Sequence, residues 1–86
     1  MTDTWIVLVE DRHSGVDALP FSTGEAALAA AREQMRSIVA HPEHIREVAL
    51  TPDDIEDGLV LCLEYAVERD SVRVVKRTMD DAAGTR

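Results

Sequence analysis

The first twenty positions alternate between apolar and polar runs in a pattern that predicts two short strands. Residues 5–9 are apolar at every position, and a run of that length is too short for a helix. Its odd and even positions fall on opposite faces, and a strand that is apolar on both faces lies inside a sheet. Gly15 then allows the chain to turn, and residues 16–19 return as a weaker strand. Pro20 ends this second strand and marks it as an edge.

A long helix follows these two strands. Residues 22–25 match a capping box, in which Ser22 is the N-cap and the Glu25 side chain reaches back to its amide. The run from there to Ala40 is rich in Ala, Glu, Gln and Arg, which favour helices. Pro42 disfavours helical geometry at His41 and therefore ends the helix. The apolar stripe of this helix consists of Leu28, Ala31, Met35, Ile38 and Val39.

Residues 42–58 predict one or two short helical turns. One turn begins at Pro42 and runs towards Leu50, and the other begins at Thr51 with Pro52 in its first turn. We expect the apolar residues of this segment to point inward; they are Ile45, Val48, Leu50 and Ile55.

Residues 59–79 alternate again and predict a hairpin that turns at Arg69-Asp70. The expected register places Val67 opposite Val72, Tyr65 opposite Val74, Glu64 opposite Val75 and Cys62 opposite Arg77. This register fails where Lys76 meets Leu63, so we expect a bulge or a frayed end there.

Together these elements predict an α+β fold of ββαββ order. We expect a four-stranded, largely antiparallel sheet with one long helix packed on one face, and a short helical or irregular segment before the last hairpin. A chain of 86 residues has room for one core, so residues 1–79 would form a single α+β domain. Residues 80–86 would form a disordered C-terminal tail.

Three short motifs connect this chain with other proteins. They are Glu10-Asp11-Arg12-His13 after the first strand, Pro20-Phe21-Ser22 before the helix, and Asp70-Ser71-Val72-Arg73-Val74 in the final hairpin. On these motifs the chain resembles a group of small uncharacterised proteins from actinobacteria and their phages. The resemblance implies the same ββαββ fold, and it brings no activity, ligand or catalytic residue with it.

Composition narrows the classes of partner. Seventeen acidic residues against nine basic ones give a net charge of −8, which opposes binding to nucleic acid and to anionic membranes and favours a basic partner. Aromatic residues make up 3% of the chain, which leaves no aromatic-lined ligand pocket, and we expect no cofactor. Cys62 is the single cysteine, no segment reaches the length of a membrane span, and the first residues do not match a signal peptide. We therefore expect a cytoplasmic protein.

No group of side chains predicts catalysis, and we expect no enzymatic activity. The densest polar cluster follows the first strand and consists of Glu10, Asp11, Arg12 and His13. Since neighbouring strand residues point to opposite faces, Glu10 and Asp11 cannot converge while the strand stays regular. We interpret them as a contact surface.

Two further patterns imitate metal sites. His41 and His44 have the i, i+3 spacing of metal ligands, but the sequence supplies no obvious third ligand, so we expect no metal there. Residues 53–64 imitate a calcium loop, yet Ile55 at its third position cannot bind calcium and a strand follows. We interpret Cys62 as a small core residue.

The most informative feature is an imbalance between one helix and a sheet that is apolar on both faces. The helix can cover one face, through Leu28, Met35 and Ile38. The opposite face then keeps apolar side chains whose exposure forfeits several kcal/mol, at about 25 cal/mol per Å². These are Ile6, Leu8, Val60, Cys62 and Val75. Either residues 42–58 or a second copy of the protein must cover them.

Three functional hypotheses follow from this sequence. The first is a non-catalytic protein-interaction module, a homodimer whose acidic loops meet a basic partner. The second is an acidic mimic of nucleic acid that inhibits a DNA-binding protein, with Glu10, Asp11, Asp17, Asp53, Asp54, Glu56 and Asp57 along one face. The third is an enzyme or metal protein centred on Glu10 and His13, together with His41, His44 and Cys62.

Overall fold

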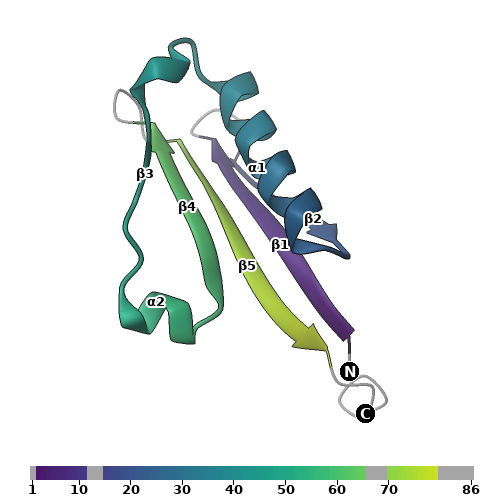
Figure 1. Ribbon diagram of the computed structural model, residues 1–86. Coiled ribbons are helices and arrows are strands. Elements are labelled where there is room, and N and C mark those ends of the chain that lie inside the picture. Colours follow the sequence, from purple (N-terminus) through teal and green to yellow (C-terminus); the bar gives the residue numbers. More distant parts are fainter. Residues whose placement is uncertain (1, 12–14, 66–69, 80–86) are drawn as a thin grey trace.

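The computed structural model describes residues 2–11, 15–65 and 70–79. In chain order its elements are β1 (Thr2–Asp11), β2 (Gly15–Phe21), α1 (Gly24–Ile38), the 3-10 turn η1 (Pro42–His44), β3 (Ile45–Glu47), α2 (Pro52–Glu56), β4 (Leu59–Tyr65) and β5 (Ser71–Met79) (Figure 1). Arg12, His13, Val67, Arg69 and the tail 80–86 lie outside the described residues, so the predictions for them stay predictions.

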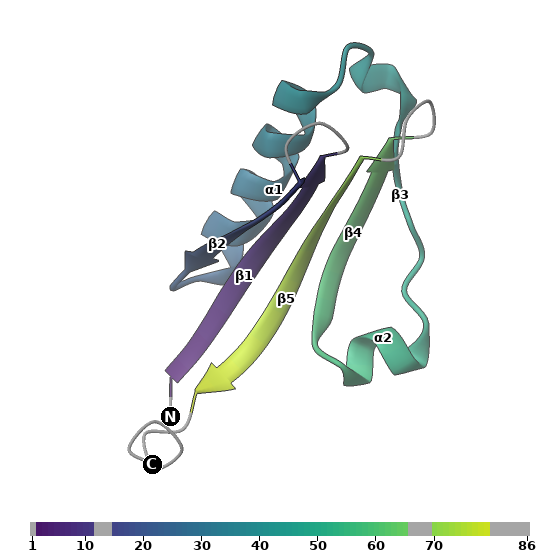
Figure 2. The ribbon, with the colours of Figure 1, turned by 180° about the vertical axis from the view of Figure 1, so that it is seen from behind.

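The strands form one antiparallel sheet in the order β2-β1-β5-β4-β3. Helix α1 lies across one face, which we call the helix face, and we call the opposite one the open face (Figures 1 and 2). The α+β class, the antiparallel sheet and the single long helix are therefore as expected. The sheet has five strands in the described residues, where the sequence predicted four.

The core lies between α1 and the helix face. Val7, Val72 and Val74 meet Met35 there, and all four side chains are fully buried. Helical spacing brings Ala27, Ala31 and Met35 onto the same side of α1, so the predicted stripe is confirmed at Ala31 and Met35. The other buried residues of this core are Val9, Val39, Leu61, Leu63 and Tyr65.

Strands β1 and β2 agree with the sequence pattern. β1 lies inside the sheet, between β2 and β5, which explains why both of its faces are apolar. Gly15, the first residue of β2, has a φ of +87°, a left-handed value that glycine adopts without steric cost. β2 is an edge strand, as Pro20 indicated, but it continues to Phe21 instead of ending at the proline.

The ends of α1 differ from the prediction by one or two residues. The N-cap is Thr23 and not Ser22: its hydroxyl oxygen accepts a hydrogen bond of 3.2 Å from the amide of Ala26. Both residue types are good N-caps, and in the structure Thr23 takes this role. The helix ends at Ile38 instead of Ala40, because Val39 already has extended backbone angles.

The missed fifth strand is β3. A single 3-10 turn begins at Pro42, as expected, but the chain then becomes extended and pairs Ile45 with Tyr65 and Glu47 with Leu63. Three residues are too few to show a period, and pairing with β4 decides their conformation. The second predicted turn is confirmed as α2, where Thr51 and Asp54 form a capping box.

The predicted hairpin register is wrong. Leu63 pairs with Val72 and Leu61 with Val74, a shift of four positions along β4 from the expected register. An even shift keeps the side chains from Leu61 onward on the same face, so their assignment survived the error; beyond the bulge it is Leu59, and not Val60, that pairs with Val75. The bulge lies between the pairs made by Leu59 and Leu61, and not at Lys76.

Candidate interaction surface

The open face carries a band of apolar side chains across four strands. In one row, Ile6 lies between Pro20 of β2 and Val75 of β5, and Val75 in turn lies opposite Leu59 of β4. In the next row, Leu8 lies between Ala18 and Arg73. By strand alternation the open face consists of Thr4, Ile6, Leu8, Glu10, Val16, Ala18, Pro20, Arg46, Leu59, Cys62, Glu64, Ser71, Arg73, Val75 and Arg77.

The two halves of this band differ in exposure. Towards β4 it is closed, because Val75 is 9% exposed and Cys62 is 8% exposed. Of the two alternatives that the sequence left open, cover from within the chain applies to these two residues. Towards β2 it is open: Ile6 and Leu8 are half-buried, Ala18 and Pro20 are exposed, and Val16 is 65% exposed. Val60, the extra residue of the bulge, is 37% exposed.

Segment 51–58 supplies part of the missing cover. The guanidinium of Arg77 donates a hydrogen bond to the carbonyl oxygen of Asp57, and the amide of Lys76 donates one of 2.8 Å to Gly58. These bonds hold the end of α2 against β5. A hollow of about 270 Å³ remains beside it, lined by Leu8, Asp54, Asp57, Leu59, Arg73, Val75 and Arg77. Residues 42–58 thus cover one side of the face and leave the β1–β2 side uncovered.

Charged groups of both signs surround the band. The Arg46 guanidinium lies 3.1 Å from a carboxylate oxygen of Glu64, and that of Arg73 lies 3.7 Å from Glu10. Hydrogen bonding to the Thr51 amide lowers the pKa of Asp54. Burial raises the pKa of the Cys62 thiol, although Arg73 acts in the opposite direction. A thiol in this setting is a core residue rather than a nucleophile.

The predicted polar cluster after β1 is placed only in part. Glu10 accepts a hydrogen bond of 3.4 Å from the Ser71 hydroxyl as well as facing Arg73. Asp11 is half-buried and lies opposite Gly15. In the described structure Glu10 belongs to the rim of the open face.

The imitated metal sites have structural explanations. The rings of His41 and His44 meet edge to face at 5.9 Å, and His41 lies 3.4 Å from the Glu43 carboxylate. A hydrogen bond to its own backbone amide lowers the pKa of Glu43. Asp54 caps α2, so it serves the helix of the imitated calcium loop. Across residues 2–11, 15–65 and 70–79, no three His, Cys, Asp or Glu side chains are arranged to hold a metal.

The acidic residues of the mimic hypothesis do not share one face. Asp17 lies opposite Val9 on the helix-face side of β2, whereas Glu10 is on the open face. Figure 1 shows α2, with Asp53, Asp54 and Glu56, at the opposite end of the sheet from the last residues of β1. The mimic hypothesis therefore continues to rest on net charge.

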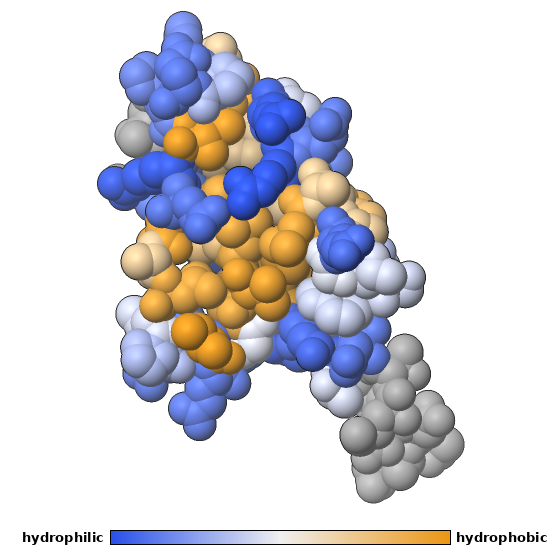
Figure 3. All heavy atoms as spheres, viewed as in Figure 1, coloured by the Kyte–Doolittle hydropathy of each residue, from blue (hydrophilic) through white to orange (hydrophobic). Residues whose placement is uncertain are grey.

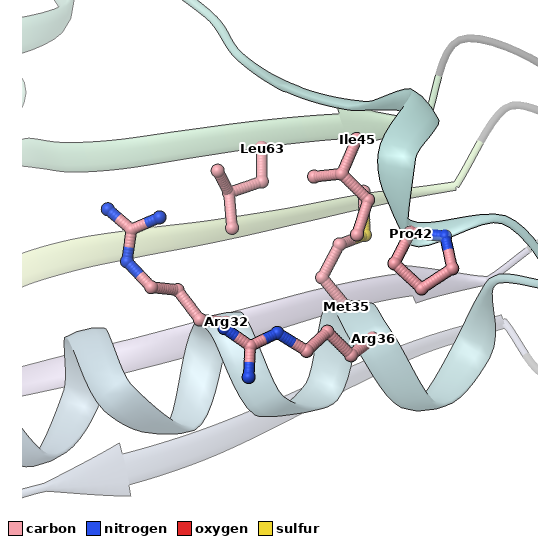
Figure 4. Close-up of a pocket in the computed structure, with 6 residues that line it drawn as sticks. All are labelled: Arg32, Met35, Arg36, Pro42, Ile45 and Leu63. Carbon is pink, nitrogen blue, oxygen red and sulfur yellow. The ribbon is translucent and has the colours of Figure 1, made fainter.

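A second hollow lies on the helix face and was missed from the sequence. It has a volume of about 170 Å³ between α1 and β4, and its lining residues are Arg32, Met35, Arg36, Pro42, Ile45 and Leu63 (Figure 4). The spacing of Arg32 and Arg36 placed them on one side of a helix. The strand that brings Ile45 to them had no signal in the sequence.

Comparison of the chain with protein-family models, curated proteins and solved structures finds no match. In the part of the chain that the structure describes, no helix combines the length and the apolar character needed to cross a bilayer. Fold and surface thus define the class of protein: a two-layer α+β protein with a helix on one face of its sheet and an apolar band on the other.

Proposed function

We propose that this protein is a non-catalytic interaction module that acts as a homodimer, in which two copies pack the open faces of their sheets together. The observation that carries the proposal is the apolar band across β2, β1 and β5, whose β2 end is exposed in the single chain. An exposed apolar band on a sheet marks an interaction surface. We take a second copy of the protein as its partner, because that partner is present in every cell that makes the protein.

The dimensions of the open face suit a weak dimer. The three strands β2, β1 and β5, spaced about 4.8 Å apart and about seven residues long, cover roughly 14 by 23 Å. This projection of roughly 330 Å² corresponds to a larger accessible area, because side chains make the surface uneven. Stable dimers bury about 800 Å² of accessible surface per partner. We therefore expect an interface area at the lower end of the range for protein dimers, and a micromolar dissociation constant.

The charges of the open face support self-association of an acidic protein. Two copies with a charge of −8 each repel one another unless the joining surface carries basic groups. Of the six basic residues in the described chain, three lie on the open face: Arg46, Arg73 and Arg77. Around a two-fold axis, these arginines of one copy face carboxylates such as Glu10 and Glu64 of the other.

The acidic surface then remains available to a basic protein. α2 and the turn after it present Asp53, Glu56 and Asp57, all exposed, at one end of the sheet. We place this function in the cytoplasm, where the single, buried Cys62 stays a free thiol.

Sedimentation equilibrium from about 1 to about 200 µM tests the dimer. The wild type should pass from monomer to dimer over this range. Ala18→Glu puts a charge in the middle of the exposed β2 end, and Ala29→Glu puts the same charge on an exposed position of α1. We expect Ala18→Glu to be monomeric and Ala29→Glu to match the wild type, with both folded by circular dichroism. A wild type that stays monomeric at the highest concentration refutes the dimer, and equal weakening by both variants refutes the open face as its interface.

A further inference from the structure

We infer that the hollow between α1 and β4 on the helix face is a binding site for a small apolar monocarboxylate, whose chain lies on the hollow's floor and whose carboxylate meets Arg32 and Arg36. We call this hollow the arginine groove; its residues are Arg32, Met35, Arg36, Pro42, Ile45 and Leu63. The inference is independent of dimerisation, because the groove and the open face lie on opposite sides of the sheet.

The groove exists because α1 does not cover the whole helix face. The helix packs mainly on β1 and β5 and barely touches β4, while β3 adds a further strand beyond it. Figure 3 shows the consequence: apolar surface gathers beside α1, over β4 and β5, and charged groups frame it. The hollow is therefore present because the sheet formed by the described strands is wider than one helix can cover.

The floor of the groove is apolar. Leu63 is 3% exposed, Met35 is fully buried and Ile45 is half-buried, and Pro42 closes one end. In Figure 4 Leu63 and Ile45 come from the strands and Met35 points from α1 towards them. A hydrocarbon chain placed there displaces water from Ile45 and Pro42, the apolar lining residues that keep exposed surface, and rests against Leu63.

Two guanidinium groups give the groove its charge preference. Arg32 and Arg36 are one helical turn apart, a spacing at which like charges repel. In Figure 4 Arg32 extends from α1 towards β4, and Arg36 extends along α1 towards Arg32. A carboxylate relieves this repulsion. The Arg32 guanidinium already holds one, since it lies 3.2 Å from a Glu47 oxygen, whereas no carboxylate of the described residues forms an ion pair with Arg36.

The size of the groove limits the ligand. Its volume of about 170 Å³ is below the roughly 300–1,000 Å³ of sites for drug-sized molecules, which excludes nucleotides and large cofactors. A straight-chain acid of about eight non-hydrogen atoms fits this limit. Because the site is shallow and exposed, we expect a dissociation constant on the order of 1 mM for such a ligand.

Sodium hexanoate is the probe for the test, and hexanamide and hexylamine are its uncharged and cationic counterparts. Amide resonances of Leu63 and Ile45 in ¹⁵N–¹H correlation spectra should shift with hexanoate, more weakly with hexanamide, and not with hexylamine. Shifts that are equal for hexanoate and hexanamide would show general apolar adsorption and overturn the inference. An absence of shifts up to about 20 mM hexanoate would also overturn it.

Matched variants separate local from global charge. Arg36→Gln should weaken hexanoate binding at least about threefold, while Arg46→Gln, an equal change of net charge on the open face, should leave it unchanged. Glu47→Gln removes the carboxylate that competes for Arg32 and should tighten binding about twofold; Glu64→Gln is its control. Equal effects of Arg36→Gln and Arg46→Gln would mean that net charge alone attracts the acid, and the arginine groove would not be the site.

Discussion

Gly58 offers the sharpest test of how α2 is joined to the sheet. It lies between α2 and β4 with a φ of +94°, a left-handed value that costs an alanine about 1–2 kcal/mol. A Cβ at this position would also lie 2.5 Å from the carbonyl oxygen of Lys76. That oxygen belongs to β5, whose backbone is held in the sheet, so it cannot move away cheaply. Relief of such a contact costs about 1–3 kcal/mol more.

Gly58→Ala should therefore lower the free energy of unfolding by about 2–5 kcal/mol in total. This is a large part of the roughly 4–13 kcal/mol expected for a domain of this length. Gly15→Ala is the control: Gly15 has a φ of +87°, yet its Cβ would meet no atom of the described residues within 4 Å. It should lose only the backbone cost of about 1–2 kcal/mol.

Urea unfolding followed by circular dichroism, at one fixed protein concentration, measures both values. A fixed concentration matters because dimerisation adds to the apparent stability. If the two alanine variants lose the same free energy, an added methyl group at position 58 does not collide with the carbonyl oxygen of Lys76. The segment after α2 then does not lie as close to β5 as the structure has it.

Two further outcomes test the open face and α2. Burial raises the pKa of Cys62, so the thiol should react with a disulfide reagent at pH 8 roughly tenfold more slowly in the folded protein than in denaturant; equal rates would show that β4 opens readily. Hydrogen bonding to Thr51 lowers the pKa of Asp54 from its ordinary value of 3.8, so its stabilising effect is complete above that value and disappears as the pH falls through the lowered one. The wild type should thus be more stable than Asp54→Asn at pH 5, and the difference between the two unfolding free energies should shrink as the pH is lowered; a difference that stays constant with falling pH would contradict this assignment.

Local patterns were sufficient for much of the fold. The apolar run of β1, the proline of β2 and the alanine-rich stripe of α1 each specify an element through residues close together in the chain. Thr51-Pro52 predicted α2 for the same reason, because a proline in the first turn acts within that turn. Ser22 and Thr23 are neighbours that can both cap a helix, and the sequence pattern did not distinguish them.

The candidate sites depended on information that the sequence pattern does not hold. Leu63 and Val72 could be assigned to one face, but their pairing could not be read from alternation, because a register shifted by four positions satisfies the same pattern. The burial of Val75 and Cys62 could not be predicted from the sequence, because it depends on the hydrogen bond by which Arg77 holds the α2 segment against β5. The arginine groove could not be predicted either, because one of its lining residues comes from β3, and a strand of three residues is too short to show a periodic pattern.

By itself the sequence determined the kind of protein this is: acidic, built from one long helix and an antiparallel sheet, with apolar residues on both faces of that sheet. These properties follow from composition and from contacts between neighbours in the chain. Only the tertiary structure decided which apolar residues stay exposed and where two arginines meet an apolar floor. Both depend on strand register and on which segment lies over which, and these are fixed by packing between residues far apart in the chain.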